Sequence, residues 1–105
     1  MSDWTVRDNP DRHRFEIDLG DGSVAYAAYM LSPGKITFTH TEVPQQHEGH
    51  GLGTFLIRTA LASARKRGLA VVPLCPFFAA YMKKHSEMWD LLDRAYRESL
   101  GVGPT

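Results

Sequence analysis

Alternating apolar and polar residues fill much of the chain's first 43 positions, and this pattern is typical of half-buried β-strands. Residues 14–19 and 35–43 follow it, the more uniformly apolar residues 24–31 are interpreted as a strand between them, and short turns containing glycine separate the three segments. We expect the first two of these segments to pair as a hairpin. Before them, Trp4 and Val6 offer either a short first strand or a loosely packed arm.

The segment 35–43 is rich in β-branched residues and ends before Pro44. Strict alternation puts its even-numbered side chains on one face of the sheet and its odd-numbered side chains on the other. The even-numbered set is Ile36, Phe38, His40 and Glu42. We therefore expect His40 and Glu42 to share a face with Phe38.

The chain changes to a helical period after residue 51. Apolar residues recur at helical spacing from Leu52 to about Arg67, and Gly68 suits the end of a helix. Residues 69–74 are then nearly all apolar, which is typical of a buried strand. Strand, helix and strand in this order predict a parallel pair with a right-handed crossover.

Two more helices are predicted beyond the buried strand. One starts at Pro76 and runs to about Lys84, and the other runs from Glu87 to about Ser99. Four side chains in this part are expected in the core: Phe77, Phe78, Met88 and Trp89. The whole pattern predicts one α/β domain over residues 1–105, with a mixed, mostly antiparallel sheet, a parallel strand–helix–strand unit and helices packed on it.

Three glycines at alternate positions, Gly49, Gly51 and Gly53, stand between the third strand and the first long helix. Glycine allows a positive φ and a close approach of ligand to backbone. The first amides of a helix have no intrahelical acceptor, and the helix dipole is positive there. The alternative is a plain turn, but alternating glycines exceed what a turn needs. The stretch therefore predicts an anion site suited to phosphate or pyrophosphate, although its spacing matches neither a P-loop nor a dinucleotide fingerprint.

The segment Glu48-Gly49-His50-Gly51-Leu52-Gly53 resembles the acyl-coenzyme A loop of the GNAT N-acetyltransferases, written Gln/Arg-x-x-Gly-x-Gly/Ala. The stretches His40-Thr41-Glu42-Val43-Pro44 and Val72-Pro73-Leu74-Cys75-Pro76 look like the small single-domain branch of that superfamily, the YjdJ type. The resemblance covers residues 18–85. It implies a shortened GNAT-like fold, in which the helix from Glu87 replaces the usual final pair of strands.

The resemblance also implies acetyl-CoA (coenzyme A) as the cofactor and an amine as the acceptor. The pyrophosphate of the cofactor would lie on the amides of residues 49–54. The cofactor-binding residues implied in this way are Val43, Gly49, His50, Gly51, Leu52, Gly53, Thr54 and Pro76. Glu48 departs from the family's Gln or Arg, and a carboxylate near a pyrophosphate is unfavourable unless it points away. His50, His47, Gln45 or Gln46 would then supply the missing donor.

Cys75 follows the buried strand at its carboxyl end, where ligands of open α/β sheets bind. Pro76 would start a helix whose positive end favours a thiolate. The other interpretation is a small buried hydrophobic residue, which most free cysteines are. The similarity to the family's cysteine motif favours a thiol at the active site, as nucleophile, transient acyl carrier or cavity lining.

Glu42 and His40 are candidate bases, because the resemblance places their strand beside the pantetheine arm and the acceptor amine must lose a proton. Simple cross-strand pairing on the sheet is the alternative. Tyr81 begins Tyr81-Met82-Lys83-Lys84-His85, which looks like the segment that supplies a general acid for the leaving thiolate in many GNAT enzymes. The alternative there is an aromatic side chain packed on the core.

Composition narrows the classes of function. The 105 residues carry 12 basic and 12 acidic side chains, so no basic excess favours nucleic acid as a partner. No apolar run approaches the ~20 residues of a membrane span, and a single cysteine fits a reducing compartment. We therefore expect a cytoplasmic protein, either a monomer or a weak dimer. No metal is expected, because His47, His50 and His85 lack the partners of a tetrahedral set.

The sequence thus favours an acetyl-CoA-dependent N-acetyltransferase acting on an unidentified amine, directly or through Cys75. A coenzyme A-binding module with little turnover is the first alternative, because the missing final strands normally help to wall the acceptor site. A partner-binding domain with a vestigial glycine loop is the second.

Overall fold

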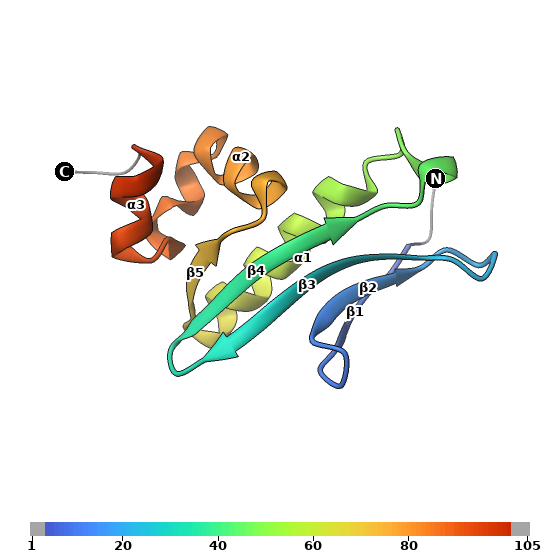
Figure 1. Cartoon of the computed structure of the whole chain (residues 1–105), viewed down its shortest axis with the longest axis horizontal. Coiled ribbons are helices and arrows are strands. Elements are labelled where there is room, and N and C mark those ends of the chain that lie inside the picture. The colour runs from blue at the N-terminus through green and yellow to red at the C-terminus, as the bar shows by residue number, and fades with distance from the viewer. Residues whose placement is uncertain (1–3, 102–105) are drawn as a thin grey trace.

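Five β-strands form one sheet, and their order across the sheet is their order along the chain. Figure 1 draws this computed structural model, which describes residues 4–101. The first four strands pair antiparallel, and the last lies parallel to its neighbour. They are β1 (Val6–Asn9), β2 (Arg14–Asp18), β3 (Val24–Ser32), β4 (Lys35–Glu42) and β5 (Ala70–Pro73). The α/β class and the mixed sheet are therefore confirmed.

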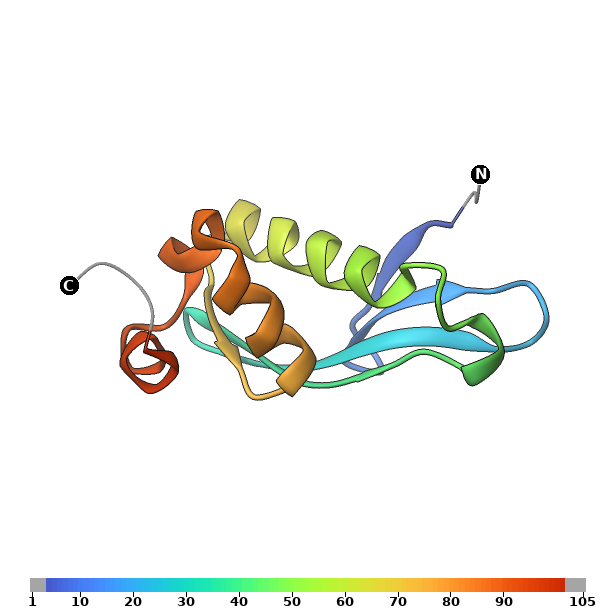
Figure 2. The same ribbon diagram turned by 90° about the horizontal axis from the view of Figure 1, so that it is seen from above.

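Helices follow the fourth and fifth strands. They are η1 (Gln45–His47), α1 (Leu52–Arg67), α2 (Pro76–Lys84), η2 (Ser86–Leu91) and α3 (Arg94–Leu100), of which η1 and η2 are 3-10 helices. Figures 1 and 2 show α1 crossing one face of the sheet, while α2, η2 and α3 gather beside β5. The predicted limits of α1 are confirmed, because Gly51 and Gly68 both adopt the left-handed conformation at its ends. Within residues 4–101, no helix is both long and apolar enough to cross a membrane.

The core lies between α1 and the inner face of the sheet, and α2 extends it. Phe38 of β4 stacks on Phe78 of α2, with ring centroids 4.1 Å apart, and both rings are fully buried. Met88 and Trp89 pack against this core as predicted. The prediction for Phe77 is wrong, because 51% of its surface is exposed. Successive helical side chains point about 100° apart, so the turn that buries Phe78 leaves its neighbour outside.

A β-bulge in β4 corrects the predicted alternation of its side chains. Tyr29 pairs with Phe38 and Ala28 pairs with His40, so Thr39 has no residue opposite it in β3. The extra residue shifts the alternation by one position. Thr41 lies opposite the fully buried Ala27 and therefore faces the core side. His40 and Glu42 consequently lie on the face opposite to Phe38, and the prediction that they share its face is wrong.

The predicted single helix from Glu87 to Ser99 is also wrong. The segment is divided into η2 and α3 by an extended stretch at Leu92 and Asp93. Leu92 forms a parallel bridge with Val71 of β5, and the Asp93 amide donates to the Val71 carbonyl oxygen at 2.8 Å. Asp93 also forms an ion pair with Lys35 at 3.1 Å. The helix is interrupted because this stretch covers the outer edge of β5, which would otherwise remain unpaired.

Candidate functional site

The loop between β4 and α1 leaves the start of the helix without side-chain caps. Gly49 and Gly51 have φ of 88° and 75°, a region that favours glycine. Gly51 is the N-cap, no side chain bonds the first helical amides, and the first turn contains no acidic residue. The first helical hydrogen bond runs from the Phe55 amide to the Gly51 carbonyl at 3.0 Å. The amides of residues 52–54 therefore have no intrahelical acceptor and can receive an anion.

Gly53 has a different physical reason to be glycine. It is part of α1 and has an ordinary helical conformation, so no positive φ requires it. A Cβ at this position would lie 3.1 Å from the ring of Phe77, which is tighter than ordinary packing allows. Gly53 thus lets α2 bring an exposed aromatic ring against the first turn of α1.

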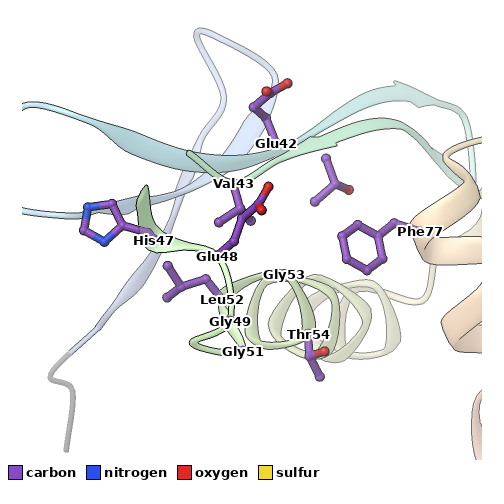
Figure 3. A pocket seen from close by; sticks show the side chains of 11 residues that line it. Glu42, Val43, His47, Glu48, Gly49, Gly51, Leu52, Gly53, Thr54 and Phe77 are labelled. Carbon is purple, nitrogen blue, oxygen red and sulfur yellow. The ribbon is translucent and has the colours of Figure 1, made fainter. Parts of the chain in front are cut away.

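A pocket of about 390 Å³ lies between this loop and the far end of β4. Residues from four consecutive parts of the chain and from α2 line it. They are Thr41 and Glu42 of β4, Val43 directly after it, His47, Glu48, Gly49 and Gly51 of the loop, Leu52, Gly53 and Thr54 of α1, and Phe77 of α2. Figure 3 shows the first turn of α1 facing the end of β4 across the pocket. The predicted cofactor residues therefore gather here, except for His50 and Pro76.

His50 and Tyr81, predicted as cofactor and catalytic residues, lie in neighbouring cavities. His50 lines a cavity of about 240 Å³ with Trp4 and Phe55. Tyr81 stacks on His85, with ring centroids 4.0 Å apart, and lines a cavity of about 280 Å³ between α1 and α2. Phe77 and Thr54 also line that second cavity, so it adjoins the main pocket at these two residues.

The far end of β4 is paired on one side only. Its parallel pairing with β5 ends at Phe38 and Pro73, and the Cys75 amide then donates to the Phe38 carbonyl at 2.9 Å. From Thr39 onward, β4 continues with β3 alone as its partner in the described sheet. The pocket opens where this pairing stops, so the strand presents an unpaired edge to it.

Cys75 lies at the point where β5 turns into α2. It is the N-cap of α2, Pro76 is the first helical residue, and the side chain is 3% exposed. Thr41 Oγ1 is 3.3 Å from Cys75 Sγ, and Thr41 is half-buried and lines the pocket. The thiol is thus joined to the pocket through a threonine hydroxyl.

His40 and Glu42 form a pair on the other face of β4. His40 Nε2 is 2.7 Å from Glu42 Oε1, and the two side chains are 57% and 55% exposed. Glu42 lines the rim of the pocket, but Figure 3 shows its carboxylate on the side of the strand away from α1. The bulge therefore separates the four predicted catalytic residues. His40 and Glu42 lie outside, Cys75 lies inside, and Tyr81 lies in the adjoining cavity.

A side-chain hydrogen bond ties the loop to the turn between β2 and β3. His47 Nε2 is 2.9 Å from Asp21 Oδ2, and the His47 ring packs edge-on against Trp4. Hydrogen bonds from Ser23 and from His47 hold the pKa of the Asp21 carboxyl well below its usual range. Asp21 therefore stays ionised over the pH range in which imidazoles titrate and can anchor His47 throughout it.

Sequence reasoning missed Thr41 and Phe77 as pocket residues. Thr41 could be found only by anticipating the bulge, and its sequence neighbours carry no glycine or proline to mark one. The sequence does contain a hint for Phe77: two adjacent aromatic residues on one helix cannot both face the core, so one of Phe77 and Phe78 must lie outside it. His47 was considered only as an alternative donor, and it does line the pocket.

The comparison with known protein families agrees with this geometry. The sequence model described as GCN5-related N-acetyl-transferase matches residues 14–92. The matched stretch begins with β2, contains the glycine loop and Cys75, and ends at the Leu92 bridge. No curated protein matches the chain closely enough to be counted as a relative. The family match spans well over half of the chain, and the protein therefore belongs to the GCN5-related N-acetyltransferases.

Proposed function

We propose that this protein transfers an acetyl group from acetyl-CoA to an amine acceptor that the sequence does not identify. One observation carries the proposal: the uncapped start of α1 and the unpaired end of β4 line a single pocket, and Thr41 connects that pocket to a thiol. A family of N-acetyltransferases supplies the reaction class. The three sequence stretches quoted above favour its small YjdJ-type branch. We further expect a cytoplasmic protein that is a monomer or a weak dimer.

The pocket fits a coenzyme A pyrophosphate in shape and in hydrogen-bonding groups. The glycines leave open space, because a Cβ placed at Gly49 or Gly51 meets nothing within 4 Å. The amides of residues 52–54 would donate to the phosphate oxygens, and the helix dipole would favour the negative charge. Val43 and the unpaired edge of β4 would lie along the pantetheine arm, with its thioester toward Cys75 and Pro76.

The direct route would use the His40–Glu42 pair as the base. His40 would accept a proton from the acceptor ammonium, and the Glu42 carboxylate hydrogen-bonded to it would stabilise the imidazolium that forms. The neutral amine nitrogen then forms a bond to the acetyl carbon, and the bond from that carbon to the coenzyme A sulfur breaks. Tyr81 would protonate the departing thiolate from the adjoining cavity, which the pocket meets at Phe77. The proton that the nitrogen releases as the amide forms would restore the Tyr81 phenol. In this route the acceptor approaches from the face of β4 that the cofactor does not occupy.

The alternative route would pass the acetyl group through Cys75. Its thiolate attacks the thioester carbon, the coenzyme A thiolate leaves, and an acetylated Cys75 remains. The acceptor amine then attacks this second thioester and regenerates the thiol. The 3% exposure of Cys75 requires a local opening for this route, whereas the direct route requires none.

Steady-state thioester consumption with a panel of amines tests the proposed function. Acetyl-CoA consumption that depends on an amine would support it, and calorimetry that shows no binding of acetyl-CoA would overturn it. Cys75→Ser separates the routes, because the direct route survives this change and the covalent route does not. Two further measurements test the same choice between the routes. One is whether coenzyme A protects Cys75 from iodoacetamide, and the other is whether mass spectrometry finds an acetylated chain.

A coenzyme A-binding module with little turnover is a second candidate, and one observation favours it. Beyond α2, the described chain supplies only η2, the Leu92 bridge and α3, and the bridge covers the sheet edge instead of walling an acceptor site. Binding of acetyl-CoA without amine-dependent consumption would select this candidate. The absence of both binding and turnover would leave a partner-binding domain.

A further inference from the structure

The bulge in β4 decides which polar side chain the strand presents to the cofactor side. With regular pairing, His40 and Glu42 would continue the face of Phe38. Because Thr39 is inserted without a partner, Thr41 takes that face instead, opposite the buried Ala27. Bulges commonly lie next to active sites, where they redirect a side chain. The side chain redirected inward here is a hydroxyl.

Thr41 is placed between the pocket and the thiol. It lines the pocket, is half-buried, and has its hydroxyl oxygen 3.3 Å from the Cys75 sulfur. A thiol and a hydroxyl can each donate to the other, but a thiolate can only accept. The contact therefore becomes a one-way hydrogen bond from Thr41 once Cys75 loses its proton, and hydrogen bonds to ionised groups are the stronger kind.

We infer that Thr41 is a positioning residue for Cys75, holding the sulfur behind the pocket wall that Thr41 itself lines and donating a hydrogen bond to its thiolate form. The inference rests on the proposed function and deepens it, because it names the group that would make the buried thiol usable in acetyl transfer. The hydrogen bond of the Thr41 hydroxyl goes to Cys75, and within residues 4–101 it forms none to the His40–Glu42 pair or to the glycine loop.

Other groups near the thiol do not duplicate this contact. On β4, His40 and Glu42 bind each other on the opposite face. On α2, Tyr81 lines the adjoining cavity, and on α1 the buried side chains that face the sheet are apolar. Glu48 lines the pocket from the loop and carries a charge that opposes a second anion. A Thr41→Val change alters none of these charges, so its effect on Cys75 reports the hydroxyl.

The test compares Thr41→Val and Thr41→Ser with wild type by the pH profile of Cys75. Because the chain has one cysteine, ultraviolet absorbance of the thiolate, with Cys75→Ser as the blank, follows this residue alone. The midpoint should rise by about one pH unit in Thr41→Val, since a hydrogen bond to a charged group is lost. Thr41→Ser keeps the hydroxyl and should restore the wild-type midpoint.

Thr37→Val is the matched control. Thr37 is also half-buried on β4, but it lies before the bulge, opposite Met30, on the face away from the core. Thr37→Val should leave the pH midpoint of Cys75 ionisation unchanged, although its effect on folding stability should be similar to that of Thr41→Val. Equal midpoints in wild type, Thr41→Val and Thr37→Val would overturn the inference, and so would a serine variant that behaves like the valine variant.

Acetyl transfer supplies a second reading. If the acetyl group passes through Cys75 and Thr41 acts on that residue, Thr41→Val should lower kcat about tenfold with little change in KM, and whatever rate remains in a Cys75→Ser background should not fall further. An equal loss in both backgrounds would show that Thr41 acts elsewhere and would overturn the inference. The absorbance titration needs no acetyl-CoA, so a protein without turnover would refute the proposed function while the titration still decides the role of Thr41.

Discussion

The two ends of β4 differ in strand pairing and in burial, although they belong to one strand. From Lys35 to Phe38 the strand has a partner on each side, and its inward side chains are fully buried and apolar. From Thr39 to Glu42 it keeps β3 alone, and its side chains are polar and partly or largely exposed. The first end stabilises the fold. The second leaves one edge of the strand without a partner strand, and a ligand can approach the backbone there.

The bulge at Thr39 marks the boundary between the two ends. At the paired end, alternation follows the regular pattern and can be predicted. At the free end, the inserted residue reverses the faces, so that Thr41 meets Cys75 and the His40–Glu42 pair turns outward. A single extra residue thus gives the two faces of the free end different chemistry, a hydroxyl beside a thiol on one and an imidazole–carboxylate pair on the other.

The largest expected effect is at the paired end. Phe38→Ala removes a ring that stacks on Phe78 at 4.1 Å and has no exposed surface. The lost contacts and the cavity should cost about 3–5 kcal/mol of folding free energy. Chemical denaturation measures this loss. A cost below about 1 kcal/mol would mean that the two ends of β4 do not differ in stability as the packing indicates.

At the free end, His40→Gln and Glu42→Gln should behave in the opposite way. Both side chains are more than half exposed, so neither change should lower the melting temperature appreciably. If the pair is the base of direct transfer, each change should reduce kcat by about 100-fold, the lower end of the effect of general base catalysis. Steady-state kinetics with saturating amine measures this. Unchanged rates would leave the pair as a surface contact and favour the route through Cys75.

The sequence predicts the paired end of β4 and the limits of α1 because both depend on local signals. β-branched alternation predicts the strand, and the positive φ that Gly51 and Gly68 allow sets the limits of the helix. The prediction of an anion site in the loop rests on local signals as well, namely Gly49, Gly51 and Gly53 before a helix. These features need no information about distant parts of the chain.

The features that sequence reasoning missed depend on contacts between distant residues. The break at Leu92 and Asp93 exists because the edge of β5 needs a partner, which no helical period in that segment records. Thr41 reaches the core face only through its pairing with β3. Phe77 lines the pocket because Gly53, 24 positions earlier in the chain, leaves room for its ring. Local propensity was outweighed by tertiary pairing in each case.

The third expected effect concerns the loop that faces the free end. Gly51→Val and Gly34→Val make a matched pair, because their φ values are 75° and 74° and neither has an atom within 4 Å of the added Cβ. Both should lose about 1–2 kcal/mol of stability from the left-handed conformation. Only Gly51→Val should also weaken acetyl-CoA binding, by at least tenfold in titration calorimetry. Equal affinities in the two variants would remove the phosphate-cradle interpretation of the loop.

The smallest expected effect concerns the charge of the pocket at the free end. Glu48 and Glu42 both line it, and its lining within residues 4–101 includes no lysine or arginine. Glu48 stands where the family carries Gln or Arg, so its carboxylate should oppose the pyrophosphate. Glu48→Gln should therefore tighten coenzyme A by about 1 kcal/mol, or roughly fivefold, and by less at high salt. Glu98→Gln on α3 makes the same change of charge at an exposed position and is the control. If Glu48→Gln weakens binding while Glu98→Gln does not, Glu48 supports the loop that cradles the phosphate, and the pocket tolerates its charge for that reason.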